Sequence, residues 1–515
     1  MSNGGRICVS VCAETADELI EQINRAESLA DVFEIRFDCL NENELNLADL
    51  EESGKIVKKI LENVKKDFLL TFRPKEQGGK RDLSLSEREV FWNLVTNFFC
   101  GADFEEDFAK NHSERFHKPL ICSHHDFKGV PENLNEIYER LKSVNGVDVV
   151  KIAVQTDDIT DAISIWKLLD KAKKENRKII PIAMGESGKW TRILSLAHGA
   201  FMTYASLDSG RETAPGQVSA HDLIEVYLAK DLNEDTEIYG VIGGNTSYSM
   251  SPYIHNAAFK FHGRNAVFVP LQVRNLNEFM RRMVKRETCE IGLNFRGFAV
   301  TIPHKQNIIS HLDAMDETAR RIGAVNTVKI EDGKLSGFNT DARGFIEPLL
   351  NVYGDLKNAR AAVVGAGGAA RSAVYALKKS GADVAVFARN PKKAENLAEE
   401  FQVELREIQK TEARNSKKVF ENFDILVNTT PLGTKGELEN ETVATAEQLE
   451  SVKLVYDLIY NPLETRLLRE AEKANVRKIG GLEMLLAQAR EQQKIWTETD
   501  APRAEMRRAA LEKLR

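Results

Sequence analysis

Eight short runs rich in β-branched and aromatic residues recur along the first 230 or so residues, and longer amphipathic segments separate several of them. Apolar runs that alternate with segments of helical spacing are typical of strand-helix repeats. Eight repeats in this length predict a (β/α)8 barrel, whose functional groups lie at the carboxyl ends of its strands. The expected strands are Arg6–Cys12, Val32–Asp38, Phe68–Arg73, Ala102–Phe108, Leu120–Asp126, Val147–Gln155, Ile179–Gly185 and Phe201–Leu207. The fourth contains the acidic run Glu105-Glu106-Asp107 and fits the pattern least.

A second α/β region follows the polar, acidic stretch at residues 229–237. Strands and helices alternate from 238 to about 342, and the apolar run Ala361–Val364 then ends in a glycine-rich turn that opens a helix. A strand, a glycine turn and a helix in this order are typical of a dinucleotide-binding Rossmann domain. We therefore expect an α/β protein with a barrel at residues 1–230, a second domain at 238–342 that residues 481–515 complete, and a Rossmann domain at 343–480.

Composition excludes several classes of protein. The 515 residues include 71 Lys and Arg against 78 Asp and Glu, without a long basic block, so we expect no nucleic-acid partner. Apolar stretches fall short of the roughly 18 residues that span a bilayer, and the first residues lack a signal-peptide core, so we expect a cytoplasmic protein without a membrane partner. The six cysteines form no CxxC pair, and we interpret them as reduced core residues without a metal site.

Polar residues at the predicted strand ends of the barrel indicate amine chemistry. Lys151 lies inside the apolar run Val149–Val154, where desolvation would lower its pKa and favour the neutral amine that condenses with a ketone. A lysine that extends from the strand end to solvent fits its position equally well. Imidazoles and arginines follow neighbouring strands, at His124–His125, Arg36, Arg73 and Arg192.

Residues 6–217 resemble the type I 3-dehydroquinate dehydratases. The similar segments are Glu34–Asp38, Thr71–Gly79, Ser123–Phe127, Val150–Ala153, Ala183–Gly188 with Arg192, and Ala214–Gln217. The resemblance implies that Lys151 forms a Schiff base with 3-dehydroquinate and that His125 transfers protons. It assigns Glu34, Arg36, Arg73, Arg192, Thr213 and Gln217 to substrate binding.

One position departs from the family pattern. The family motif has a glutamate that orients the catalytic histidine, and this chain has Gln77 there. Glutamine can hold an imidazole by a hydrogen bond, but it cannot stabilise imidazolium as a carboxylate does. We therefore expect Gln77 beside the substrate and a less basic His125, with the neighbouring Glu76 as an alternative partner.

The glycine turn Gly365–Ala370 indicates a nicotinamide cofactor. Its helix can hold a pyrophosphate at its first amides, and the next strand ends at Arg389 instead of an acidic residue. Arginine suits the 2′-phosphate of NADP, so we expect NADP(H) rather than NAD. The expected cofactor residues are Gly365, Gly367, Gly368, Ala369, Arg389, Lys393, Thr429, Gly481 and Met484.

Residues 238–497 resemble the shikimate dehydrogenases. The similar segments are Ser249–Asn256, Gly297–Lys305, Gly323–Thr327, Gly337–Asp341, the glycine turn, Asn428–Gly433, Tyr456–Pro462 and Gly481–Gln488. The resemblance implies that Lys305 and Asp341 are the catalytic pair. It assigns Ser249, Ser251, Thr301, Asn326, Tyr460 and Gln488 to shikimate. From the residues alone, Lys305 and Asp341 could also be a surface ion pair, and Ser249 and Ser251 could cap the helix that begins near Pro252.

The two resemblances together predict an enzyme that converts 3-dehydroquinate to 3-dehydroshikimate and then to shikimate. Two alternatives stay open. In one, Gln77 marks a barrel that has become a binding or regulatory module on an active dehydrogenase. In the other, the enzyme is a catabolic quinate/shikimate dehydrogenase whose barrel acts on the same ring system.

Overall fold

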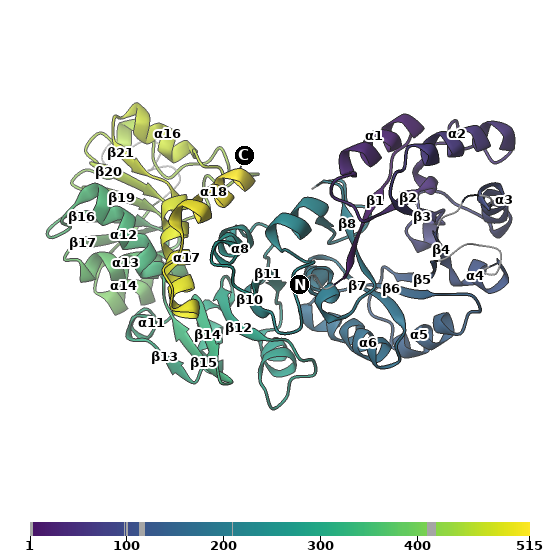
Figure 1. Ribbon diagram of the computed structural model, residues 1–515. Helices are drawn as coiled ribbons and strands as arrows, with labels where there is room; N and C mark the ends of the chain where they lie inside the picture. Colours follow the sequence, from purple (N-terminus) through teal and green to yellow (C-terminus); the bar gives the residue numbers. More distant parts are fainter. Residues whose placement is uncertain are drawn as a thin grey trace. The chain divides into compact units, whose positions relative to one another are not determined.

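The computed structural model describes residues 4–96, 98, 101–112, 119–208, 210–408 and 419–514, with the side chain of Lys393 left out. These residues form two compact units. The first contains residues 1–252 and 265–295, and the second contains residues 253–264 and 296–515. The described residues form three sheets, and Figure 1 labels most of their strands and helices.

The first sheet is a ring of parallel strands in the order β7-β6-β5-β4-β3-β2-β1-β8, with the short β9 added beside β8. A hydrogen bond from the amide of Phe201 to the carbonyl of Ile179 links the two ends of the ring, so the strands close into the predicted barrel. The strands are β1 (Arg6–Val11), β2 (Val32–Arg36), β3 (Asp67–Thr71), β4 (Gly101–Glu105), β5 (Leu120–Asp126), β6 (Val149–Gln155), β7 (Lys178–Met184), β8 (Met202–Ser206) and β9 (Val218–Ser219).

Amphipathic helices cover the outside of the ring (Figure 1). Each buries its apolar face against the strands; α6, for example, buries Trp166, Leu168 and Leu169. Thr15 caps α1 and Ser84 caps α3 through their side-chain oxygens, which fixes where these helices begin. The helices are α1 (Ala16–Ala26), α2 (Leu50–Glu62), α3 (Leu85–Val95), α4 (Glu106–His112), α5 (Leu134–Lys142), α6 (Ile163–Lys174) and α7 (Lys189–Leu194), with the short 3-10 turns η1 (Phe37–Cys39) and η2 (Lys75–Gln77).

The fourth strand differs from the sequence prediction. We expected it over Ala102–Phe108, but β4 ends at Glu105 and α4 begins at Glu106. Asp103 and Glu105 are buried, whereas the carboxylate of Glu106 forms ion pairs with Lys110 and Arg140 on the outside. The acidic residues therefore belong to two different elements, which the apolar pattern could not separate.

The second sheet is mixed and has the order β11-β10-β12-β14-β15-β13. Strands β12 and β15 pair antiparallel with β14, whereas β10 and β11 are parallel. The strands are β10 (Glu237–Gly243), β11 (Ala266–Gln272), β12 (Phe295–Val300), β13 (Ala314–Met315), β14 (Thr327–Glu331) and β15 (Lys334–Phe338). The helices of this region are α8 (Ser251–Phe261), α9 (Leu276–Phe279), α10 (His304–Asn307) and α11 (Glu317–Ile322).

The third sheet is entirely parallel, and its order, β18-β17-β16-β19-β20-β21, is that of a Rossmann fold. Its four inner strands, between β18 and β21, are mostly apolar because both of their faces are covered. They are β16 (Arg360–Val364), β17 (Asp383–Ala388), β18 (Glu404–Glu407), β19 (Ile425–Asn428), β20 (Leu454–Asp457) and β21 (Arg477–Ile479). The helices are α12 (Asp341–Tyr353), α13 (Gly368–Lys379), α14 (Glu395–Phe401), α16 (Arg466–Lys473), α17 (Gly481–Thr497) and α18 (Arg503–Leu514).

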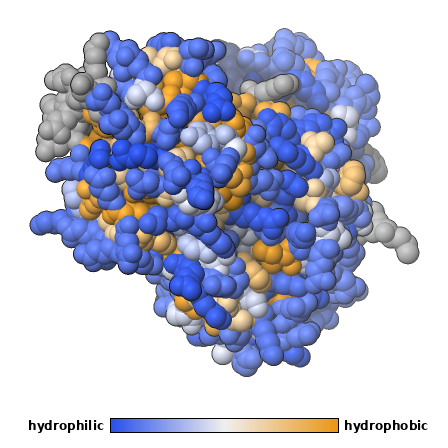
Figure 2. Space-filling model, turned by 90° about the vertical axis from the view of Figure 1, so that its left-hand side faces the viewer, coloured by the Kyte–Doolittle hydropathy of each residue, from blue (hydrophilic) through white to orange (hydrophobic). Residues whose placement is uncertain are grey.

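The surface drawn in Figure 2 is mostly hydrophilic, with hydrophobic residues in several small groups between the charged ones. Isolated groups of this kind are ordinary on a folded protein. Within the part of the chain that the structure describes, no helix is long and apolar enough to cross a bilayer.

Candidate active sites

The barrel pocket lies at the carboxyl ends of the strands, and Lys151 occupies its inner wall. Lys151 is in the middle of β6 and is only 4% exposed. Its Nζ lies 2.7 Å from Oδ2 of Asp103 and 3.6 Å from Oε1 of Glu34. The ring of Tyr204 lies 3.9 Å from the same nitrogen, in a cation–π arrangement. The amine is therefore buried and held by two carboxylates and an aromatic face, and it does not extend to solvent.

All nine residues that we predicted for the barrel site line this one pocket. They come from six strands and the loops that follow them, which explains why they are scattered over more than 180 residues of sequence. The nine are Glu34, Arg36, Arg73, Gln77, His125, Lys151, Arg192, Thr213 and Gln217.

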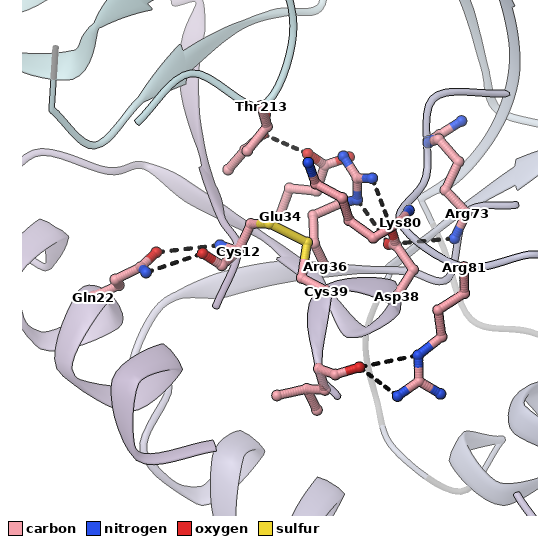
Figure 3. Close-up of a disulfide and its surroundings, with 12 residues drawn as sticks. Cys12, Gln22, Glu34, Arg36, Asp38, Cys39, Arg73, Lys80, Arg81 and Thr213 are labelled. Atoms are coloured by element: carbon pink, nitrogen blue, oxygen red, sulfur yellow. Dashed lines mark hydrogen bonds and ion pairs between the residues drawn. A yellow bond between two sulfur atoms is a disulfide. The ribbon is translucent and has the colours of Figure 1, made fainter. Parts of the chain in front are cut away.

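Arg36 and Asp38 form a bidentate pair beneath the pocket. Nε and Nη2 of Arg36 donate to the two oxygens of Asp38 at 2.8 and 2.7 Å. Burial alone would raise the pKa of Asp38, but the Arg36 guanidinium overrides it and the pKa is lowered. The backbone amide of Lys80 also donates to Asp38 (Figure 3). Asp38 thus keeps Arg36 fixed at the pocket wall.

A buried ionic cluster joins β3, β4 and β5. Nη2 of Arg73 lies 2.7 Å from Oδ2 of Asp103, and Nη1 lies 3.2 Å from Oε1 of Glu105. Burial, followed by the charge of Asp103, raises the pKa of Glu105 to about 7 even though Arg73 and Arg88 lower it. Sequence reasoning missed Asp103 and Glu105 as site residues. Their signal was the pair of acidic residues in the least regular strand, where alternate positions face the barrel interior.

His125, at the end of β5, is held from two sides. Its ring atom Nδ1 lies 3.0 Å from Nη1 of Arg73, and its backbone amide donates to Oε1 of Gln77 at 3.0 Å. Burial lowers the pKa of the imidazole well below its usual value, and the neighbouring charges of Arg73 and Lys151 add to this effect. Gln77 therefore contacts the backbone of His125, and its hydrogen bond does not reach the ring as we had expected. Glu76 has no bond to the ring either.

Arg192 is the cation of this pocket that has no anionic partner among the described residues. It is 2% exposed, its Nη2 donates to the carbonyl of Pro215 at 3.3 Å, and its Nε has no hydrogen-bond partner. Burial lowers its pKa to about 10. Thr213 and Gln217 bond to each other nearby, through Nε2 of Gln217 and Oγ1 of Thr213 at 3.0 Å. A buried guanidinium without a carboxylate is suited to bind an incoming anion.

A disulfide between Cys12 and Cys39 lies close to this site (Figure 3). Cys12 follows β1 and Cys39 ends η1, directly after Arg36 and Asp38. Our interpretation of the cysteines as reduced is therefore wrong for this pair; Cys8, Cys122 and Cys289 are free thiols, and Cys100 lies outside the described residues. The error arose because the two cysteines are 27 residues apart in sequence, and only the parallel pairing of β1 with β2 brings them together. Among the described residues, no group of side chains could hold a metal ion.

The dehydrogenase region of the second unit contains the Lys305–Asp341 pair. Nζ of Lys305, on α10, lies 2.5 Å from Oδ2 of Asp341, the first residue of α12. Nδ2 of Asn326 donates to the other oxygen of Asp341 at 2.7 Å and lies 3.5 Å from Oε1 of Gln488. Asn326 and Gln488 are buried, and the carboxylate is therefore oriented by an amide on one side and an ammonium on the other.

The other predicted shikimate residues are placed as follows. The carbonyl of Thr301 accepts from the amide of His304 at the start of α10, and Tyr460 is partly buried after β20, where desolvation raises its pKa. Ser249 and Ser251 belong to the first unit. The Ser249 hydroxyl accepts from the amide of Ser251, the first residue of α8. That contact fits the alternative in which Ser249 caps the start of α8.

The glycine turn adopts the geometry that a dinucleotide site requires. Gly365 has φ +118°, and a Cβ there would lie 2.3 Å from Oγ1 of Thr429. Gly367 precedes the first turn of α13, which begins at Gly368. A Cβ on Gly368 would lie 3.6 Å from Cδ of Lys305, so the turn and the Lys305 side chain are neighbours. The absence of side chains leaves the first amides of α13 open to a phosphate.

The remaining predicted cofactor residues surround this turn or follow neighbouring strands. Arg389 is exposed directly after β17 and has no ion-pair partner among the described residues. Gly481 begins α17, and a Cβ there would lie 2.2 Å from the carbonyl of Leu458, so only glycine permits this approach. Ala369 is half-buried on α13, Met484 is buried on α17, and the side chain of Lys393 lies outside the described residues.

Comparisons with known families cover both halves of the chain. The type I 3-dehydroquinase model matches residues 7–234. The shikimate dehydrogenase substrate binding domain matches 241–328, the shikimate/quinate 5-dehydrogenase model 349–483, and the shikimate 5′-dehydrogenase C-terminal domain 481–511. Fold and sequence thus define an α/β enzyme that joins a lyase barrel to a dehydrogenase in one chain.

Relatives with curated descriptions narrow this class. A chloroplastic bifunctional 3-dehydroquinate dehydratase/shikimate dehydrogenase from Arabidopsis thaliana is 34% identical over 98% of this chain and 84% of its own length. This chain belongs to that family of bifunctional enzymes. An NADP(+) shikimate dehydrogenase from Methanocaldococcus jannaschii is 40% identical over 55% of this chain and 99% of its own. A solved shikimate dehydrogenase from Thermus thermophilus, with NADP(H) and shikimate, is 35% identical over 53% of this chain and 98% of its own, with a TM-score of 0.46.

Proposed function

We propose that this chain catalyses two consecutive reactions, the dehydration of 3-dehydroquinate to 3-dehydroshikimate and the NADPH-dependent reduction of that product to shikimate. The observation that carries the first reaction is the buried Lys151 amine in one pocket with His125 and an unpaired Arg192. Membership of the bifunctional family supports the pairing of the two activities.

For the dehydratase, we assign Lys151 as the nucleophile that forms an imine with the substrate ketone. Asp103 and Glu34, within 3.6 Å of its Nζ, are placed to take up the proton that the ammonium must lose. An imine acidifies the neighbouring carbon, so His125 can remove a proton there and return it to the departing hydroxyl, which leaves as water. Arg192 supplies the positive charge for the substrate carboxylate, and Arg36, Thr213 and Gln217 face its hydroxyls.

For the dehydrogenase, we assign Lys305 and Asp341 as the pair that handles the proton at the reacting oxygen. The ammonium lies between the carboxylate and the glycine turn, so it can donate its proton while Asp341 holds it in place. Asn326 and Gln488 fix the carboxylate and offer hydrogen bonds to the substrate, with Thr301 and Tyr460 as further contacts. Ser249 and Ser251 stay predicted contacts that rest on the resemblance alone.

The cofactor that we infer for this site is NADP(H). The residues present fit it, since the turn passes Thr429 too closely for a Cβ on Gly365 and leads into the first amides of α13, and Arg389 is a cation after β17 with no ion-pair partner among the described residues. When bound, the nicotinamide supplies the hydride for the reduction. Thr429, Gly481 and Met484 then complete the wall on the side of β19 and α17, and Lys393 stays a predicted contact. A cytoplasmic address and the lack of a nucleic-acid partner also stay predictions.

One experiment tests the order of the two reactions. Purified protein is given 3-dehydroquinate alone, and ultraviolet absorbance of the new conjugated double bond is followed before NADPH is added. We expect absorbance to rise without cofactor and then to fall as NADPH is oxidised. Oxidation of NADPH with added 3-dehydroshikimate, but no reaction of 3-dehydroquinate, would favour the barrel as a non-catalytic module. Oxidation of quinate with NADP in preference to shikimate would favour the catabolic alternative.

A matched pair of variants tests the Schiff base. Borohydride added with 3-dehydroquinate should attach the reduced ligand covalently to the peptide that contains Lys151. Lys151→Ala should abolish both dehydration and labelling, whereas Lys178→Ala, which removes an exposed lysine from the start of the adjacent β7, should retain both. Label on another peptide of the active enzyme would refute the assignment.

A further inference from the structure

The ring of His125 accepts a hydrogen bond on the nitrogen that a base would use. A guanidinium has five N–H donors and no acceptor, so the 3.0 Å contact between Nη1 of Arg73 and Nδ1 of His125 has one direction only. Nδ1 is therefore the unprotonated nitrogen, and the neutral ring carries its proton on Nε2. Nε2–H already holds a proton, so Nδ1 is the atom that can accept one, and Arg73 covers it.

Arg73 itself is held firmly by groups other than the imidazole. Its side chain is 2% exposed, Nη2 pairs with Asp103 at 2.7 Å and Nη1 donates to Oγ of Ser123 at 3.0 Å. The strand register places these partners side by side, because Thr71 of β3 pairs with Asp103 and Ser123 of β5 pairs with Glu105. Losing the bond to His125 would thus leave Arg73 anchored by its charge partner.

A second acceptor lies within reach of the same nitrogen. Oε1 of Glu105 is 3.2 Å from Nη1, is buried, and has no hydrogen bond of its own. Nη1 carries two hydrogens, which Ser123 and His125 now occupy. A small rotation that moves one N–H from Nδ1 to Oε1 exchanges one hydrogen bond for another and satisfies a buried carboxylate oxygen.

We propose that Arg73 is a positioning residue that fixes the Nε2–H tautomer of His125, covers Nδ1 in the free enzyme, and turns to Glu105 when substrate binds. The proposal rests on the dehydratase function proposed above. Once uncovered, Nδ1 takes the proton from the carbon beside the imine, and the C–H electron pair becomes the enamine double bond. The imidazolium then returns a proton to the leaving hydroxyl, which departs as water, and the ring is neutral again.

The movement of Arg73 away from His125 should be visible in the pH dependence of kcat and kcat/KM. The acid limb of kcat/KM reports the free enzyme, in which Arg73 lies on Nδ1, and the acid limb of kcat reports the enzyme with substrate bound. Removing a cation from the ring raises its pKa. The acid limb of kcat should therefore lie about one pH unit or more above that of kcat/KM in the wild-type enzyme.

Two variants separate positioning from structure. Arg73→Lys keeps a positive charge for Asp103 and Glu105 but loses the planar fork, so its kcat/KM limb should move up toward its kcat limb. Arg88→Lys is the matched control, since Arg88 is also buried and pairs with Glu105 but does not contact His125. It should leave both limbs in place. Equal shifts in the two variants, or unmoved limbs in Arg73→Lys, would overturn the proposal.

A spectroscopic measurement on the full-length chain does not depend on activity. The ten histidines can be labelled with 15N, and the His125 resonances assigned by their loss in His125→Gln. We expect a proton on Nε2 and none on Nδ1 in the free protein near neutral pH, and 3-dehydroquinate should change the Nδ1 shift. A proton on Nδ1 in the free protein refutes the proposal whether or not Arg73→Lys folds. The expected tautomer in a protein that never dehydrates 3-dehydroquinate would refute the proposed function instead, and the Arg73–His125 contact would stand.

Discussion

The barrel pocket and the dehydrogenase site differ in how far their cationic side chains are buried and paired with carboxylates. In the barrel, Lys151, Arg36 and Arg73 each have a buried carboxylate partner within 2.7 Å, and Arg192 is the cation left open. In the dehydrogenase region, the Lys305 side chain is 20% exposed and Arg389 extends into solvent. A buried charge is costly unless it is paired, and the barrel pairs Lys151, Arg36 and Arg73 in this way. At the dehydrogenase site Lys305 keeps a carboxylate partner, and Arg389 is the cation without one among the described residues, open to a charged cofactor.

The largest effect should come from removing the one ammonium of the dehydrogenase pair. Lys305→Met should lower kcat for reduction of 3-dehydroshikimate by about 10²- to 10⁴-fold, because no other cation contacts Asp341 in the described residues. Dehydration by the same preparation should stay within about twofold, since the barrel has its own core. Both rates are measured on one sample, and a parallel loss of the two would mean that the sites are not independent.

A smaller effect is expected at the open cation of the cofactor site. Arg389→Ala should raise KM for NADPH about tenfold, or ~1.4 kcal/mol, through loss of a charge-assisted contact with the 2′-phosphate. KM for NADH should hardly change. Arg360→Ala, at the opposite end of the same sheet where Arg360 pairs with Asp383, is the control. An equal rise in KM for NADPH and NADH would show that Arg389 has a structural role and does not bind the 2′-phosphate.

The buried carboxylate of Glu105 should make the stability of the barrel depend on pH. The pKa of Glu105 is about 7 in the folded protein and near 4.5 in the unfolded chain, so the folded state binds the extra proton between these values. Its contribution is complete below pH 4.5 and is lost as pH rises through 7. Glu105→Gln should therefore gain about 2 kcal/mol of stability relative to the wild type as the pH rises from 5.5 to 8.5. Tryptophan fluorescence during denaturation reports this, because Trp92, Trp166 and Trp190 are buried in the barrel; a constant difference would show that Glu105 does not titrate there.

The smallest effect concerns Gln77, whose side chain accepts from the His125 backbone. Gln77→Ala should slow dehydration only a few-fold, roughly 0.5–1 kcal/mol, because a backbone contact is lost and the ring keeps Arg73. Gln77→Glu should keep the acceptor and raise the pKa of His125, which moves the acid limb of kcat upward. A loss above about 100-fold in Gln77→Ala would show that Gln77 holds the ring during turnover.

Much of the fold could be predicted because each element has its own local pattern. Strand β5 ends where Asp126 was expected, and β17 covers the predicted Asp383–Ala388. The glycine turn was predictable for the same reason, since its conformation is set by residues next to one another. Candidate site residues were found where a resemblance supplied them, and all nine of the barrel residues line one pocket.

Interactions between distant segments were not predictable from local pattern. Glu105 and Glu106 are identical in sequence terms, yet one faces Arg73 inside the barrel and the other faces Lys110 and Arg140 outside. Asp103 belongs to the site because it accepts a hydrogen bond from Lys151, which lies 48 residues further along the chain. Gln77 bonds to the backbone amide of His125, and a pattern of side chains in the sequence does not predict a contact with the backbone.

The Cys12–Cys39 disulfide should make the stability of the barrel depend on whether its surroundings are oxidising or reducing. It closes a loop that contains α1 and β2, and so carries Glu34 and Arg36 to the pocket on a covalently tied segment. Closing a loop of this length lowers the entropy of the unfolded chain by an amount worth about 3.5 kcal/mol in the chain-entropy model. Reducing this bond should remove its contribution to the stability of the barrel and leave the stability of the dehydrogenase region unchanged. Heating the enzyme with and without a reductant, and assaying both reactions, would show whether a single chain can carry two different heat tolerances.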